Sequence, residues 1–395
     1  MVLQLDIIQS VALAVVVLLL GQTIRGKVKV LEKFCIPAPV IGGLIFAILV
    51  LFLRQSNILY FEMDTTLQGI LMTAFFTTVG FTASFQLLKK GGFKVILFLI
   101  LAIVLVALQN VIGVTLARLF NLNALIGLST GSVPMTGGHG TSGAFAPLLE
   151  ERGAIGASTV AMASATFGLI CGSMLGGPVA KRLIEKNNLL ASESVDVFSH
   201  PTEETTTEAL VPKNFSLAAF QIILAMGIGT IISMLIQKTG LTFPSYIGAM
   251  FSAAIIRNIS DLTHAYKVPS TEVDILGNIS LSIFLSMALM GLRLWELADL
   301  AIPMLVMLVA QAVLMGIFAY FVTFNVMGKN YDAAVLAGGH CGFGMGATPN
   351  AIANMEAISS KYGPAPAAFF IIPLVGSLFI DFVNSGIILA FINLF

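Results

Sequence analysis

The residues best suited to bind small ions and solutes lie in two glycine-rich stretches of an otherwise apolar sequence. The first is Leu128–Ala146 (LSTGSVPMTGGHGTSGAFA) and the second is Ala337–Ala351 (AGGHCGFGMGATPNA). Backbone this rich in glycine, with Pro134 and Pro349 inside it, makes a poor continuous helix. Irregular backbone leaves N–H groups that suit an anion and carbonyl groups that suit a cation. The two stretches are therefore candidate binding segments.

Side-chain oxygens in and near these stretches add to this chemistry, because hydroxyl and amide oxygens are ligands that hard cations prefer. The residues predicted to contact a solute are Ser132, Thr136, Gly137, Gly138, Thr141, Gly344, Gly346, Thr348, Asn350 and Asp381. The residues predicted to bind Na+ are Asp381, Asn384, Thr136, Asn350 and Asn110. For Asn110, a hydrogen bond between two helices is the competing role.

Asp381 is the acidic residue that cannot be placed near the end of an apolar segment; it lies in Leu378–Asn384 (LFIDFVN). An ionised carboxylate in hydrocarbon is costly unless it faces a cavity or a cation. Asn384 follows three residues later, and we expect it on the same helical face. The pair indicates either a set of Na+ ligands or a counter-charge for the amino group of a solute. A protonated, structural aspartate is the alternative.

Other interpretations of these stretches are weaker. Small residues allow helices to pack closely, but close packing does not need proline and this density of polar groups. His139 and His340 each follow two glycines, and two histidines without a third ligand do not indicate a metal site. Gly140–Gly143 (GTSG) with a histidine elsewhere would suit an intramembrane serine protease with Ser142 as nucleophile. Motifs this short recur freely in glycine-rich sequence.

The composition indicates a polytopic membrane protein made of helices. The chain has 395 residues, of which 57% are hydrophobic and 10% charged, with a formal net charge of zero. A soluble domain has roughly 25% charged residues. The three cysteines lack the spacing of a metal site or a disulfide framework. Apolar runs of about 17 to 25 residues predict ten membrane spans, near 5–23, 38–53, 67–88, 95–117, 154–180, 215–237, 243–260, 272–292, 300–327 and 366–394.

The distribution of basic residues predicts the orientation. With the amino terminus outside, fifteen of the 20 lysines and arginines fall in inner loops. The remaining five are Arg54, Arg118, Arg152, Lys238 and Arg293. Because basic residues accumulate on the cytoplasmic side, both termini are predicted to face outward.

The chain divides into two related halves. Residues 181–213 are rich in Ser, Thr and Glu and are predicted to be a cytoplasmic linker between 1–180 and 214–395. A shift of about 210 residues superposes features such as Gly80 on Gly291. Each half has five predicted spans, so the second half must enter the membrane from the opposite side, as in the inverted repeats of secondary transporters. By the same parity, 124–150 and 332–358 are predicted to be re-entrant hairpins that dip in from opposite faces.

Several strings resemble the bacterial sodium/glutamate symporter family over nearly the whole chain. They are Ile36–Gly43 (IPAPVIGG), Thr136–Thr141 (TGGHGT), Leu276–Ser282 (LGNISLS), Met287–Leu292 (MALMGL), and Gly328–Val335 (GKNYDAAV) running into Gly339–Pro349 (GHCGFGMGATP). Thr136 and Met345 stand where the family pattern has Ser and Leu. The resemblance implies Na+-driven uptake of glutamate across the inner membrane and an elevator movement of the hairpins. It also implies a homodimer, and no cofactor or enzymatic activity.

The resemblance does not decide which groups bind the carboxylates, the ammonium group and Na+. No arginine lies in the middle of a predicted span to bind a carboxylate, so the hairpin amides are expected to bind the anion. Asp381 would serve either the ammonium group or Na+. The alternatives are a Na+-coupled carrier of another small carboxylate, a Na+/H+ exchanger centred on Asp381, and, remotely, the serine protease.

Overall fold

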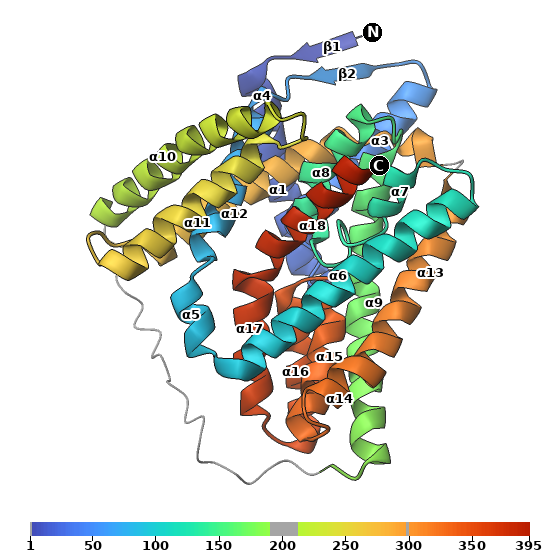
Figure 1. The fold of residues 1–395 in the computed structure, drawn as a ribbon. Helices are drawn as coiled ribbons and strands as arrows, with labels where there is room; N and C mark the ends of the chain where they lie inside the picture. Colours follow the sequence, from blue (N-terminus) through green and yellow to red (C-terminus); the bar gives the residue numbers. More distant parts are fainter. Residues whose placement is uncertain (1, 190–211, 298–299) are drawn as a thin grey trace.

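The fold is described by a computed structural model for residues 2–189, 212–297 and 300–395, and it is almost entirely helical (Figure 1). The helices before the predicted linker are α1 Ile7–Lys27, α2 Lys29–Lys33, α3 Ala38–Gln55, α4 Thr66–Thr82, α5 Phe85–Lys90, α6 Gly92–Leu119, α7 Ala124–Leu128, α8 Gly138–Glu151 and α9 Ala157–Lys186. Those after it are α10 Pro212–Gln237, α11 Ser245–Thr263, α12 Ser270–Met290, η1 Leu294–Leu297, α13 Ala301–Ile317, η2 Phe318–Thr323, α14 Phe324–Val326, α15 Tyr331–Gly344, α16 Thr348–Tyr362, α17 Pro366–Leu378 and α18 Ile380–Leu394.

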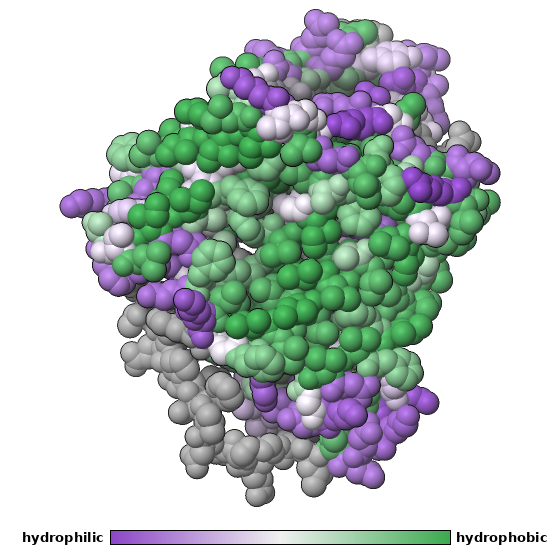
Figure 2. Space-filling view, viewed as in Figure 1, coloured by the Kyte–Doolittle hydropathy of each residue, from purple (hydrophilic) through white to green (hydrophobic). Residues whose placement is uncertain are grey.

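The helices are those of a multi-pass membrane protein. Among the described residues, seven helices are long and apolar enough to cross a membrane: α1, α3, α6, α9, α10, α12 and the continuous segment Ala301–Val326. The last predicted span is a pair of helices, Pro366–Gly376 and Ile380–Leu394, bent by 45°. The apolar helix α4 is shorter, and α11 contains Arg257 and Asp261 near its end. Figure 2 shows a broad hydrophobic belt between hydrophilic ends, as expected for a surface that faces lipid.

Three boundaries differ from the predicted ones. The third span was predicted to reach residue 88, but α4 ends at Thr82 and the short α5 follows. The predicted linker begins inside α9, which continues to Lys186, and α10 begins at Pro212; residues 190–211 of the linker lie outside the described part. In addition, Val2–Leu5 (β1) and Tyr60–Met63 (β2) form a parallel two-stranded sheet, which the helical periodicity did not predict.

Six helices form one body, and their contacts are reciprocal between the two halves. The pairs α1–α3 and α10–α11 each pack together, α4 packs against α10 and α11, and α12 packs against α1 and α3. Both pairs depend on glycine. A Cβ at Gly42 would lie 2.0 Å from the carbonyl oxygen of Val17, and a Cβ at Gly248 would lie 2.2 Å from that of Gly229. We call these six helices the scaffold body.

The remaining long helices form a second body around the two glycine-rich segments. Helix α6 packs against α7 and α13, and α9 packs against α8, α15 and α16 (Figure 1). A large buried cluster, which includes Phe98, Met135 and Phe343, fills the space between α6, α9, α13, α15 and α17. We call this part the hairpin body.

The two flanks of each glycine-rich segment lie close together. In the first, a Cβ at Gly153 would lie 3.6 Å from the Asn123 side chain, so the two flanks meet. In the second, the Tyr331 hydroxyl donates to the carbonyl oxygen of Gly363. The inner ends of the two segments also meet, because the hydroxyl of Thr136 lies 3.4 Å from the carbonyl oxygen of Gly344. The irregular part of the second segment is shorter than the composition suggested. Helix α15 continues to Gly344, and only residues 345–347 lie outside a helix.

Candidate functional site

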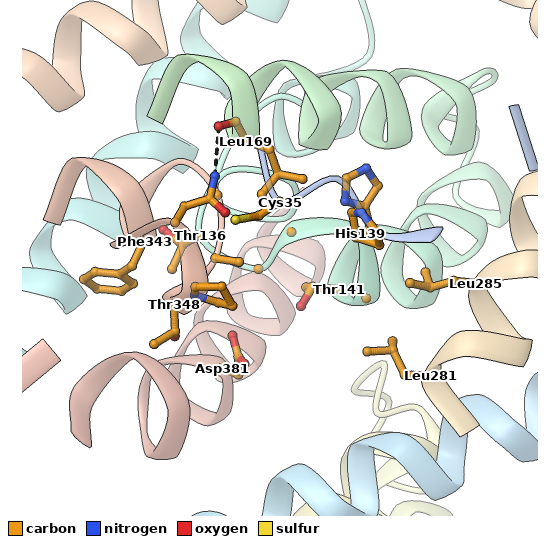
Figure 3. A pocket seen from close by; sticks show the side chains of 18 of the residues that line it. Cys35, Thr136, His139, Thr141, Leu169, Leu281, Leu285, Phe343, Thr348 and Asp381 are labelled. Carbon is orange, nitrogen blue, oxygen red and sulfur yellow. Dashed lines mark hydrogen bonds between the residues drawn. The ribbon is translucent and has the colours of Figure 1, made fainter. Parts of the chain in front are cut away.

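A central cavity of about 410 Å³ lies where the inner ends of the two segments face the scaffold body (Figure 3). This volume is in the range of small-molecule pockets, roughly 300–1,000 Å³. One wall is polar and comes from residues 136–141, 346–350, Gly376 and Asp381. The other wall is apolar and comes from α4 and α12, with Phe75, Phe76, Val79, Leu281 and Leu285.

Two helices begin at the polar wall. Helix α8 begins at Gly138 and helix α16 at Thr348, and the first residues of both line the cavity. The first-turn N–H groups of a helix have no partner within it, and each helix start has about half a positive elementary charge. Pro349 fits at the start of α16, where its missing N–H is no loss. The two starts together give the cavity a positive potential without a basic side chain.

Asp381 is the acidic side chain among the described residues that line the cavity. It lies in the first turn of α18, directly after the bend between α17 and α18. Its carboxylate is half-buried, and in the described part of the chain it has neither a hydrogen bond nor an ion pair. Figure 3 shows it pointing into the space between Thr348 and Thr141. No lysine or arginine is among the described residues that line this cavity.

Asn350 adds a fixed acceptor to the same wall. Its Nδ2 donates to the carbonyl oxygen of Leu169 (3.0 Å) and to the hydroxyl of Ser173 (2.7 Å). Because both amide hydrogens are engaged, the Oδ1 atom is the free end, and it is buried without a partner. An unpaired buried carbonyl is unfavourable unless something donates to it or binds it.

The structure brings most of the predicted site residues together. The predicted residues that line the cavity are Thr136, Gly137, Gly138, Thr141, Gly346, Thr348, Asn350 and Asp381. Gly344 does not line the cavity. Its carbonyl oxygen accepts a hydrogen bond from Gln109 Nε2 (2.7 Å). Ser132, Asn110 and Asn384 do not line it either. The predicted set of Na+ ligands is therefore divided between the cavity and a region behind it.

Asp381 and Asn384 both lie on α18, but only Asp381 lines the cavity. Asp381 faces the cavity, whereas Asn384 is fully buried and its Nδ2 donates to the carbonyl oxygen of Ser132 (3.2 Å). On the other side of that residue, Asn110 Oδ1 accepts from the Ser132 N–H (2.8 Å). Asn110 thus bonds to the turn between α7 and α8 and not to a second helix.

The sequence analysis missed the scaffold side of the cavity. No local sequence pattern marks the residues of its apolar wall, or Cys35, Pro37 and Pro39, as lining a cavity. Apolar residues in a span look alike whether they face lipid or a solute. A second cavity shares Pro37, Pro39 and Ser282 with the first and continues toward Arg25 and Glu32. The second cavity therefore lies beside the central one, near the carboxyl end of α1.

His139, His340 and Ser142 each have a hydrogen-bond partner within the fold. Ser142 donates to the Gly138 carbonyl oxygen within its own helix (2.7 Å), and His139 pairs with the Thr166 hydroxyl (3.0 Å). His340 is fully buried, with Nδ1 2.9 Å from the Thr323 hydroxyl, and it stacks on Phe343. No cluster of three potential metal ligands from His, Cys, Asp and Glu occurs among the described residues.

Comparisons with known proteins agree on one family. The sequence profile described as sodium/glutamate symporter matches residues 3–364. The chain is 43% identical to the sodium/glutamate symporter of Escherichia coli (strain K12) over 397 aligned positions, covering 99% of this chain and 98% of the relative. It is 41% identical to the sodium/glutamate symporter of Haemophilus influenzae (strain Rd), covering 96% and 95%. These relatives are named as transporters and not as enzymes, and the chain belongs to the sodium/glutamate symporter family.

Proposed function

We propose that the protein takes up glutamate across the bacterial inner membrane, driven by the inward movement of Na+. The main support is the arrangement of two helix starts and one unpaired carboxylate around the central cavity. Glutamate has two carboxylates and one ammonium group. In this proposal the starts of α8 and α16 bind the carboxylates, and Asp381 provides the opposite charge. The names of the relatives support glutamate and Na+ as the transported species.

The charge balance of the cavity supports coupling to a cation. The two helix starts supply about one positive charge, whereas glutamate and Asp381 each bring about one negative charge. A bound Na+ would restore neutrality and lower the cost of removing the anion from water. One Na+ also cancels the opposition of an interior-negative membrane, roughly 2.3 kcal/mol per charge per 100 mV, and a second makes transport electrogenic.

Glutamate affinity is therefore expected to depend on Na+. In purified protein, replacing choline with Na+ should lower the dissociation constant for glutamate by about tenfold or more, because the coupling between the two ligands is favourable. Isothermal titration of glutamate at several Na+ concentrations measures this. Equal affinity in choline and Na+ would contradict the coupling, and tighter binding of another small carboxylate would identify that solute instead.

The proposal includes two inverted five-span halves, with 181–213 as the linker and both termini outside. The reciprocal packing of α4 and α12 supports the repeat, as do the glycine contacts within α1–α3 and α10–α11. The two segments, re-entrant in this proposal, begin at opposite ends of the molecule in Figure 1, which is what inversion requires. A homodimer remains a prediction from the family resemblance.

We further propose that the hairpin body moves along the scaffold body like an elevator. The cavity lies between the two bodies, with its polar wall on one and its apolar wall on the other, so sliding would transfer a bound solute. A Cβ at Gly140 would lie 3.4 Å from Leu281 Cδ1, which identifies a contact across this boundary.

Joining the bodies at this contact should stop transport. Gly140→Cys and Leu281→Cys, combined in a background without Cys35, Cys171 and Cys341, are expected to lose uptake after treatment with a short thiol-specific cross-linker that a reductant can cleave. Reductant should restore uptake, and each single cysteine variant with the same reagent is the control. Cross-linked protein that still transports at the uncross-linked rate would contradict the elevator movement.

A Na+/H+ exchanger centred on Asp381 is the second candidate. The unpaired carboxylate suits it, but an exchanger needs no pair of helix starts aimed at an anion. Na+ flux that does not depend on glutamate would favour the exchanger.

A further inference from the structure

In the first glycine-rich segment and on the neighbouring helix α18, outside the central cavity, three oxygen atoms are buried without a hydrogen-bond partner. They are the side-chain oxygens of Ser129, Ser132 and Asn384, and all three residues are 0% exposed. Buried polar atoms in proteins are almost always paired. Two of these residues, Ser132 and Asn384, are hydrogen-bonded to each other, and Ser129 is three residues from Ser132 in the chain, so the unpaired oxygens indicate a ligand.

The contacts of Ser132 connect it to Asn384 and to Asn110. Asn384, from α18, donates its Nδ2 to the Ser132 carbonyl oxygen, which leaves its Oδ1 as the unpaired atom. Asn110, from α6, accepts from the Ser132 N–H. Its unpaired atom, Nδ2, is a donor and not a cation ligand. Ser129 lies three residues before Ser132, directly after the end of α7.

The backbone of the same segment is rich in unused acceptors. Pro134 has no N–H, so the carbonyl group of Thr130 lacks the donor that a continuous helix would supply. Within the described residues, no hydrogen bond reaches the carbonyl oxygens of Ser129 or Thr130. Hydroxyl, amide and carbonyl oxygens near the carboxyl end of a half-helix are the ligands that coordinate Na+ in transporters of this general architecture.

We propose that the coupling Na+ binds to the side-chain oxygens of Ser129, Ser132 and Asn384, and that Asp381 binds the ammonium group of the solute instead of Na+. This inference rests on the proposed function. The structure separates the two roles, because Asp381 lines the central cavity and the other three residues do not.

This location explains how Na+ would promote glutamate binding without touching it. The Ser132 carbonyl oxygen accepts from the Gly137 N–H (3.0 Å), and Gly137 directly precedes α8. An ion that orders residues 129–132 therefore also fixes the position of the α8 start at the cavity. The entropic cost of ordering this turn would then fall on Na+ binding. Glutamate that binds afterwards would not bear this cost.

The test uses Na+ alone on purified full-length protein. Wild-type protein is expected to unfold at a higher temperature in NaCl than in choline chloride, because a ligand that binds only the folded state stabilises it. Ser129→Ala, Ser132→Ala and the double variant should lose this Na+-dependent shift. Their half-saturating Na+ concentration for glutamate binding should rise by about tenfold. Asp381→Asn should keep the shift and lose glutamate binding.

Ser252→Ala is the matched control, because Ser252 in the scaffold body is also buried with an unpaired hydroxyl. It should keep the wild-type Na+ shift. Alanine removes an unpaired hydroxyl and makes no cavity larger than one atom, so the serine variants should remain folded in choline. The Na+ site would be overturned if the double variant kept the Na+-dependent rise in unfolding temperature, or if Asp381→Asn lost it. Either result would leave the proposed function intact. A wild-type protein without Na+-dependent glutamate binding would overturn the proposed function itself.

Discussion

Asp381→Asn is expected to abolish Na+-driven glutamate uptake, with a loss of about 100-fold or more. The substitution keeps the shape of the side chain and removes the charge that faces the central cavity. No other acidic side chain is among the described residues that line this cavity. The ammonium group of glutamate would then be buried without a partner, and truncating one member of a buried charge pair costs about 2–5 kcal/mol. Initial rates of labelled-glutamate uptake into vesicles, normalised to the amount of protein, measure the effect.

Asp274→Asn is the control for this experiment. Asp274 is also an aspartate on a membrane helix, α12, but it is exposed and does not line the central cavity. Its replacement should leave uptake near the wild-type rate. Near-normal uptake by Asp381→Asn, in protein that elutes as a single folded species, would remove Asp381 from the site.

Gly138→Ala is expected to reduce uptake by about tenfold or more while the protein still folds. Gly138 begins α8 with a φ of +62°, and a Cβ there would lie 3.3 Å from the carbonyl oxygen of Gly346 on the opposing segment. An L-residue in the left-handed region costs about 1–2 kcal/mol. Relaxing this strain would rotate the start of α8 and turn its N–H groups away from the anion, so the KM for glutamate should rise.

Gly227→Ala provides the matched glycine control. Gly227 lies in α10 of the scaffold body, and a Cβ at this position would meet no atom within 4 Å. Alanine is the better helix former by roughly 1 kcal/mol, so this variant should be at least as stable as the wild type and transport normally. If Gly138→Ala also transports with the wild-type KM, the start of α8 does not bind the carboxylate.

The glycine-rich segments and most of the apolar helices could be predicted because their signals are local. Glycine, proline and hydroxyl residues are conspicuous in apolar sequence, and the predicted segment 124–150 begins with α7 at Ala124 and ends one residue before α8 does at Glu151. That this segment re-enters the membrane stays a prediction. The family resemblance then supplied Na+ and glutamate, which the composition alone did not.

The details of the site required tertiary structure. The bend before Asp381 falls at Phe379, in an apolar run that resembles continuous helix, so it could not be predicted from the sequence. Asp381 and Asn384 both follow the bend on α18, and only the packing around that helix gives them different environments. Likewise, Phe75 and Leu285 line the cavity only because α4 and α12 pack against the hairpin body. Ser129 is one hydroxyl among several in the first glycine-rich stretch, and its lack of a partner is visible only in the folded chain.

Labelled-glutamate uptake into proteoliposomes, with and without an inward Na+ gradient, tests the central claim most directly. With Na+ outside and choline inside, glutamate should accumulate transiently above its external concentration and then decline as the gradient dissipates. With equal Na+ on both sides and no membrane potential, the label should only equilibrate. Uptake with the same rate and extent in both conditions, or no uptake in either, would contradict Na+-coupled glutamate transport by this protein.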